Sequence, residues 1–140
     1  MKKYIFIGIG GSLGAVLRFV IKAIQIGAYK NMPVNTLLIN AVGSFMLAFT
    51  LTVALEICEL DAHVHLGITT GFLGAFTTFS TLCKETVELM RHGFYNVALF
   101  YPAISAVLGF AAAYSGVYLA RKVGPGVIKK RRADILGENE

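Results

Sequence analysis

The sequence predicts an all-α membrane protein with four transmembrane helices, the third of them broken near its middle. Hydrophobic residues make up 56% of the 140 residues, and the mean hydropathy is +0.67. A helix that spans a bilayer needs roughly 20 predominantly apolar residues. The windows that meet this requirement are residues 4–26, 34–55, 64–90 and 95–120. We therefore expect one four-helix membrane domain over residues 1–126 and a short tail, basic and then acidic, over residues 127–140.

The first window is predicted to be a retained helix and not a cleaved signal peptide. It carries Arg18 and Lys22 and has no small-residue cleavage site. Glycines near its start form a face on which two membrane helices can approach closely, and these are Gly8, Gly10, Gly11 and Gly14. At the depth of Arg18, an arginine must reach the interface, pair with a carboxylate or face water.

In the second window, Asn40 is the informative residue because Ile39 and Ala41 beside it are apolar. An asparagine inside a membrane helix commonly hydrogen-bonds a neighbouring helix. The alternative is that its NH₂ group is a fixed donor for a solute that passes through. Both interpretations are consistent with the sequence.

The third window contains residues 71–81 (GFLGAFTTFST), which are poorly suited to a continuous helix. Gly71 and Gly74 weaken a helix, and hydroxyl side chains are interleaved with Phe76 and Phe79. Irregular backbone in a membrane is tolerated only where it is buried in protein or lines a wet cavity. The segment predicts a conducting or binding site, and the alternative is a tightly packed helix crossing.

The fourth window carries a stripe of positions that lie four residues apart on one helix face: Tyr101, Ser105, Gly109 and Ala113. Residues 124–126 (GPG) are predicted to end this helix. Glu85 and Glu88, at the end of the third window, are interpreted as an exposed and charge-balanced helix end.

In a membrane protein, the positions of the basic residues mainly indicate how the chain is oriented in the membrane, and only secondarily which partners it binds. The formal net charge is +5, and four spans place both termini and the middle loop on one side. The positive-inside rule favours cytoplasmic termini, but most of the bias comes from Lys129, Lys130, Arg131 and Arg132. Without these four the two sides are nearly matched, which is consistent with insertion in both orientations. The basic run lacks interleaved aromatic residues, so we expect a solvated tail beside the membrane and no nucleic-acid partner.

Enzyme chemistry is not indicated, because the sequence shows no nucleophile–base pair and no metal cluster. Cys58 and Cys83 lie in different segments without metal-ligand spacing. His63 and His65 form a pair in a short polar loop, for which a solvated or interfacial position is expected.

Three ordered motifs resemble those of the Fluc (CrcB) fluoride channels, and the resemblance covers all four windows. Residues 10–18 (GGSLGAVLR) resemble the first-helix signature, residues 35–45 (NTLLINAVGSF) the second-helix signature, and residues 71–81 the third-helix break. The resemblance implies passive export of fluoride through an antiparallel, dual-topology homodimer with two pores. It implies a multi-pass protein of the inner (plasma) membrane.

The resemblance also implies a set of site residues. Asn40 matches the pore asparagine, Phe76 and Phe79 match paired phenylalanines, and Arg18 matches the first-helix arginine. Tyr101 and Ser105 match part of a track of polar residues on the fourth helix of the family. This chain does not continue the track, because the position one turn after Ser105 is Gly109. The residues expected along the fluoride route are Arg18, Asn40, Phe76, Thr78, Phe79, Ser80, Tyr101 and Ser105.

A structural sodium ion at the centre of the dimer is a further implication of the resemblance. We expect Gly71 and Gly74 to interrupt the third helix and to leave carbonyl oxygens without their usual N–H partners. Two such breaks that meet at a symmetry axis would surround one monovalent cation. The expected sodium ligands are therefore backbone carbonyls near Gly71 and Gly74.

The physical chemistry of fluoride suits these residues. Fluoride is small and strongly hydrated, so a dry pore must replace its water with short hydrogen bonds. Amide and hydroxyl donors do this without a fixed positive charge that would trap the anion, and phenylalanine rings offer a positive edge. The alternatives are a small multidrug-type exporter, which would need a carboxylate inside the membrane, and a membrane scaffold that transports nothing.

Overall fold

The computed structural model describes residues 2–24, 28–29, 32–57 and 61–136, and the side chains of all of these except 28, 29, 57 and 125–136. Within this part of the chain, four helical spans are long and apolar enough to cross a membrane. They are Lys2–Ala23, Val34–Glu56, Ala62–Arg91 and Tyr95–Gly124. The prediction of a helical, four-span membrane protein is confirmed.

The first two spans are joined by a short β ladder. The first span is α1 (Lys2–Ala23), and the second is α2 (Val34–Thr52) with the π-helical segment η1 (Val53–Ile57) at its end. Between them, β1 (Ala28–Tyr29) pairs antiparallel with β2 (Met32–Pro33). Pro33, whose fixed φ suits a helix entry, is the residue before α2.

The third span is divided into four helical pieces. These are α3 (Ala62–Leu66), the π-helical η2 (Gly67–Leu73), α4 (Gly74–Phe76) and α5 (Phe79–Arg91). Between α4 and α5, Thr77 (φ −74°, ψ 157°) and Thr78 (φ −151°, ψ 112°) are extended. We call these two residues the break.

The predicted position of the interruption is wrong, because Gly71 and Gly74 both have helical backbone. Gly71 packs its backbone against α1, where a side-chain carbon would lie 2.6 Å from the carbonyl oxygen of Ile7. The tight contact accounts for this glycine without a helix break. The helix loses its regularity three residues after Gly74, at Thr77.

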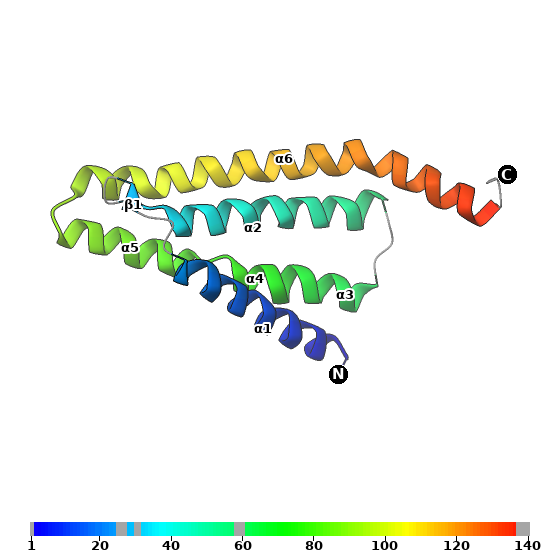
Figure 1. Ribbon diagram of the computed structural model, residues 1–140, viewed down its shortest axis with the longest axis horizontal. Coiled ribbons are helices and arrows are strands. Elements are labelled where there is room, and N and C mark those ends of the chain that lie inside the picture. Colours follow the sequence, from blue (N-terminus) through cyan, green and yellow to red (C-terminus); the bar gives the residue numbers. More distant parts are fainter. Residues whose placement is uncertain (1, 25–27, 30–31, 58–60, 137–140) are drawn as a thin grey trace.

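The break changes the neighbour of the third span. Before it, η2 and α4 pack mainly on α1, and after it α5 packs on α6 (Tyr95–Leu136). Figure 1 shows α2 and α6 side by side along their length and α1 beside α3 and α4, with both termini at the same end of the bundle.

A tight turn links α5 to α6. Gly93 has φ +80° and follows α5, while the amide of Phe94 donates to the carbonyl of Leu89 and that of Gly93 to Met90. This is the Schellman arrangement, in which glycine takes the left-handed position that ends a helix. The turn brings α6 back against α2 and α5.

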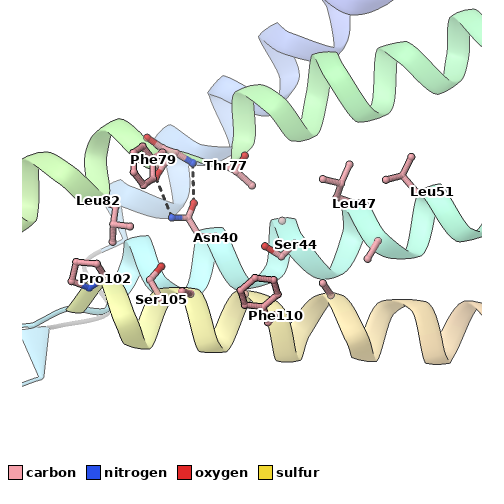
Figure 2. Close-up of a pocket in the computed structure, with 16 residues that line it drawn as sticks. Asn40, Ser44, Leu47, Leu51, Thr77, Phe79, Leu82, Pro102, Ser105 and Phe110 are labelled. Carbon is pink, nitrogen blue, oxygen red and sulfur yellow. Dashed lines mark hydrogen bonds between the residues drawn. The ribbon is translucent and has the colours of Figure 1, made fainter. Parts of the chain in front are cut away.

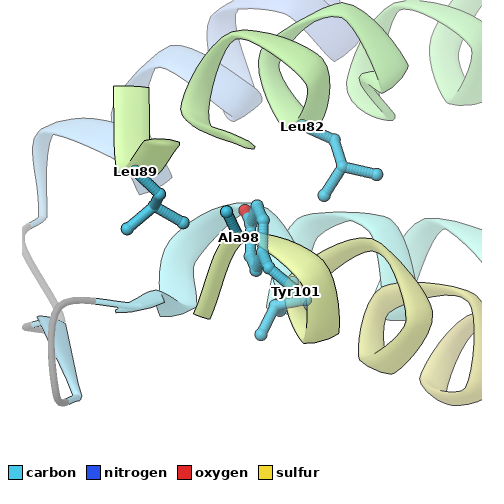
Figure 3. Packing of buried hydrophobic residues seen from close by; sticks show 5 residues of the cluster. Leu82, Leu89, Ala98 and Tyr101 are labelled. Carbon is cyan, nitrogen blue, oxygen red and sulfur yellow. The ribbon is translucent and has the colours of Figure 1, made fainter. Parts of the chain in front are cut away.

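The buried hydrophobic cluster lies where α2, α5 and α6 meet, and Figure 3 shows its packing. Its members are Leu37, Leu82, Leu89, Ala98 and Tyr101. Beyond the membrane span, α6 continues as a helix to Leu136. The expectation that residues 124–126 end the helix is therefore wrong, because a proline removes one helical hydrogen bond without always ending the helix.

Candidate functional site

A cavity of about 610 Å³ lies between α2, α6 and the break, and we call it the groove. Figure 2 shows residues of α2 and α6 that face it below the break. Its wall is formed by Asn40, Gly43, Ser44, Leu47, Ala48, Leu51, Thr77, Thr78, Phe79, Leu82, Pro102, Ser105, Ala106, Gly109, Phe110 and Ala113. Within the described part of the chain, none of these wall residues carries a charge. The groove is thus apolar with a few amide and hydroxyl groups.

Asn40 holds the break in place. Its Oδ1 accepts a hydrogen bond from the amide of Thr78 at 2.8 Å, and its Nδ2 donates to the carbonyl of Thr78 at 3.1 Å. Both bonds are dashed in Figure 2. The first replaces the bond that the Thr78 amide would make to the Gly74 carbonyl in a continuous helix. A side-chain amide offers one donor and one acceptor side by side, which matches the C=O and N–H of one residue. The interhelical interpretation of Asn40 is confirmed. Among the described residues, its second N–H has no hydrogen-bond partner and is a donor available to the groove.

Hydroxyl groups gather at the start of α5. Thr78, which is 5% exposed, is the residue before α5, and its Oγ1 accepts from the amide of Thr81 at 3.2 Å. The same hydroxyl donates to Thr81 Oγ1 at 2.9 Å and lies 3.3 Å from Ser80 Oγ. Of the predicted hydroxyls here, Thr78 lines the groove and Ser80, which is exposed, does not.

The two phenylalanines lie in different environments. Phe79 is 77% exposed and lines the groove together with Leu82, one turn farther along α5. Phe76 is 2% exposed, stacks on Phe72 at 6.0 Å and packs near Gly43, outside the groove lining. The structure therefore brings Phe79 to the groove with Asn40 and does not bring Phe76 there. Leu82 is a wall residue that the sequence reasoning missed.

The predicted stripe on α6 divides between two sites. Ser105, Gly109 and Ala113 line the groove, and Ser105 is 8% exposed. Tyr101 is fully buried and turns its hydroxyl toward Glu85.

Glu85 is the centre of a polar network that joins all four spans. Its Oε1 accepts from Thr36 Oγ1 at 2.9 Å and from Lys22 Nζ at 3.3 Å, and its Oε2 accepts from the Tyr101 hydroxyl at 2.6 Å. The side chain of Glu85 is only 19% exposed. The interpretation of Glu85 as an exposed helix end is therefore wrong, since a carboxylate at this depth needs partners.

Arg18 lies half-buried on α1, one turn before Lys22, and is not a wall residue of the groove. In the described part of the chain, no ion pair is formed by Arg18. At the other end of the bundle, Arg121 forms a two-bond ion pair with Glu56, at 2.7 and 2.9 Å.

His63 and His65 lie within α3, directly after its cap, and not in the polar loop that the sequence predicts; both are half-buried. Asp61 accepts from the amides of Val64 and His63, which holds the pKa of the Asp61 carboxyl below its usual range. His63 stacks on Phe6 of α1 at 6.3 Å. Among the described residues, no group of three or more His, Cys, Asp or Glu could hold a metal ion.

Comparisons with known proteins identify relatives over most of the chain. The model of the CrcB-like protein family (camphor resistance, CrcB) matches residues 5–117. A fluoride-specific ion channel FluC of Sulfurihydrogenibium sp. is 40% identical over 124 residues, which cover 86% of this chain and 98% of the relative. The FluC of Thermus thermophilus is 38% identical over 120 residues, with 85% and 95% covered. The FluC of Bacteroides fragilis is 36% identical over 129 residues, with 87% and 98% covered.

Proposed function

The chain belongs to the CrcB-like family, as the three motifs predict, and we propose that it is a fluoride-selective channel. It is a multi-pass protein of the plasma membrane through which fluoride leaves the cell passively. The relatives that carry the name fluoride-specific ion channel match this chain across all four spans.

The observation that carries this proposal is the composition of the groove. Its polar groups are the amide of Asn40 and the hydroxyls of Ser44, Thr77, Thr78 and Ser105, set among apolar and aromatic side chains. Thr77 Oγ1 already donates its proton to the Leu73 carbonyl and Thr78 Oγ1 donates to Thr81 Oγ1. The donors that can replace part of the water around a small anion are therefore those of Asn40, Ser44 and Ser105. The absence of a cation among the wall residues lets the anion leave again. Phe79, whose ring is exposed at the groove, can present its positive edge to the anion.

We expect purified protein in liposomes to release fluoride and very little chloride when the membrane potential is clamped. No nucleotide and no proton gradient should be needed, because the groove wall carries no carboxylate to be protonated. The measurement is efflux recorded with fluoride- and chloride-selective electrodes on the same vesicles. Equal efflux of both ions would contradict the selective channel, and no efflux of either would favour the scaffold.

A proton-coupled exporter is the second candidate, because Glu85 is a carboxylate within the third span. Its acceptor oxygens are occupied by Thr36, Lys22 and Tyr101, and it does not line the groove. Such a carboxylate is held by donors and is poorly placed to exchange protons during each transport cycle. Fluoride efflux that follows an imposed proton gradient would favour the exporter over the channel.

The active unit that we propose is an antiparallel homodimer with two pores. The near balance of charge without residues 129–132 is compatible with both orientations. The exposed aromatic and aliphatic side chains around the groove, Phe79 and Phe110 among them, offer a surface for a second copy. A single cysteine at Ala62, in a chain with Cys58 and Cys83 replaced by serine, should react with impermeant reagent from both sides of the membrane. Labelling from one side alone would exclude dual topology.

A structural sodium ion held by backbone oxygens near Gly71 and Gly74 is the remaining part of the proposal. In a continuous helix, the amide of Thr78 would donate to the carbonyl of Gly74, but here it donates to Asn40. The Gly74 position is exposed on this chain, so its carbonyl suits a cation shared with a second copy. The Gly71 carbonyl already accepts a hydrogen bond from the amide of Gly74. The Gly74 carbonyl is therefore the better candidate for a sodium ligand.

The ion would neutralise carbonyl dipoles at the break and would take no part in conduction. Replacing sodium by N-methylglucamine on both sides should dissociate the dimer or stop efflux. An intact and fully active dimer without sodium would contradict the site.

A further inference from the structure

The C-terminal part of α6 is not used by the groove. The family match ends at residue 117, whereas the helix α6 continues past Gly124 to Leu136. This extension contains Lys129, Lys130, Arg131 and Arg132. We propose that it binds the headgroups of anionic phospholipids in the leaflet where the fourth span ends.

The helix places these four charges close to the membrane surface. A rise of 1.5 Å per residue puts residues 129–132 no more than about 8 to 12 Å beyond Gly124 along the helix axis. This distance is comparable to the Debye length of about 8 Å at physiological ionic strength. Consecutive helix positions are turned by about 100°, so the four cover all sides of the helix. The basic run therefore does not occupy a single face of the helix.

Other charges at the same end of the bundle favour anionic lipid. Lys2 and Lys3 begin α1 at the end where α6 leaves the membrane (Figure 1), and both are exposed. Lys122 is exposed and, among the described residues, has no ion pair. Among the residues described at this end, the carboxylates are engaged: Glu56 pairs with Arg121, and Asp61 caps α3. In the sequence, Asp134, Glu138 and Glu140 follow the basic run.

Anionic lipid is favoured over nucleic acid for a physical reason. The run is tethered to a transmembrane helix, so headgroups are present at high local concentration, and clusters of four to eight Lys or Arg beside a span are typical of anionic-lipid binding. The extension has no aromatic side chain that could stack on a base between Gly124 and its end.

The test uses the full-length chain in nanodiscs with equimolar phosphatidylglycerol and phosphatidylcholine. After mild detergent extraction, mass spectrometry gives the ratio of the two lipids that stay bound. The ratio for the wild-type chain should favour phosphatidylglycerol. Neutralisation by K129Q/K130Q/R131Q/R132Q should lower this preference at least about fivefold, the effect expected of a single charge near the surface. Fluoride efflux should persist, because the groove is untouched.

The matched control exchanges the cations without loss of charge, as K129R/K130R/R131K/R132K, and should keep the wild-type lipid ratio. An unchanged ratio in the glutamine variant would overturn the proposal. So would a control that loses as much phosphatidylglycerol as the glutamine variant. Binding of duplex DNA by the wild-type chain, without enrichment of phosphatidylglycerol, would overturn the lipid assignment as well.

Discussion

Asn40→Asp should reduce fluoride efflux at least about tenfold, because it removes the donor that holds the break and, when ionised, repels the anion. The aspartate has no N–H, so an oxygen would face the carbonyl oxygen of Thr78, which now lies 3.1 Å from the Asn40 amide nitrogen. If ionised, it also adds a negative charge to the groove that the anion must enter. The measurement is efflux from liposomes, with size-exclusion chromatography to show that the variant is folded.

Two companion variants separate the effects of charge and of the break. Ser44→Asp places a carboxylate in the groove one turn away and leaves the Asn40–Thr78 pair intact. Asn40→Ala removes both hydrogen bonds and adds no charge. If charge dominates, Ser44→Asp should match Asn40→Asp, and if the break dominates, Asn40→Ala should match it. Wild-type efflux from folded Asn40→Asp would show that neither matters for conduction.

Gly14→Ala should destabilise the protein, whereas Gly8→Ala in the same helix should not. A side-chain carbon at Gly14 would overlap the carbonyl oxygen of Phe72, so α1 and η2 would have to separate. Overpacking of this kind typically costs about 1–3 kcal/mol. At Gly8 nothing lies within 4 Å, and alanine favours the helix by roughly 1 kcal/mol.

The two alanine variants are therefore expected to shift stability in opposite directions. Thermal unfolding in detergent, followed by circular dichroism, gives the midpoint for each. Equal midpoints for Gly8→Ala and Gly14→Ala would contradict the tight crossing of α1 and η2. Gly10→Ala, whose new carbon would overlap the carbonyl of Gly67, should behave like Gly14→Ala.

The spans can be predicted well from composition, because a membrane helix requires only a sufficiently long run of consecutive apolar residues, which the sequence shows directly. Residues 34–55 and 95–120 were expected, and the spans run over Val34–Glu56 and Tyr95–Gly124. The position of the break was predicted less well, because weak helix propensity pointed to Gly71. That glycine is instead required by the approach of α1, and the break depends on Asn40, which is 38 residues away from Thr78.

The same limit applies to Glu85. Charges beside it in the chain, Lys84 and Glu88, suggested an exposed helix end, but its hydrogen-bond partners are 63, 49 and 16 residues distant. A local pattern carries no information on partners so remote. One signal was present, since Lys22 and Thr36 are polar residues in otherwise apolar windows, and each needed a partner.

The pairing of Asn40 with Thr78 also bears on how the groove could move. An extended link of two residues between helices is a natural hinge, and transporters with alternating access rock one bundle about such a point. Here the link is pinned to α2 by two hydrogen bonds, one to the N–H and one to the C=O of Thr78. Rotation at Thr78 would break both of them, so the two halves of the third span are held as one stationary wall. A pathway with fixed walls suits an ion that diffuses through, and not a substrate that is carried by a cycle of conformations.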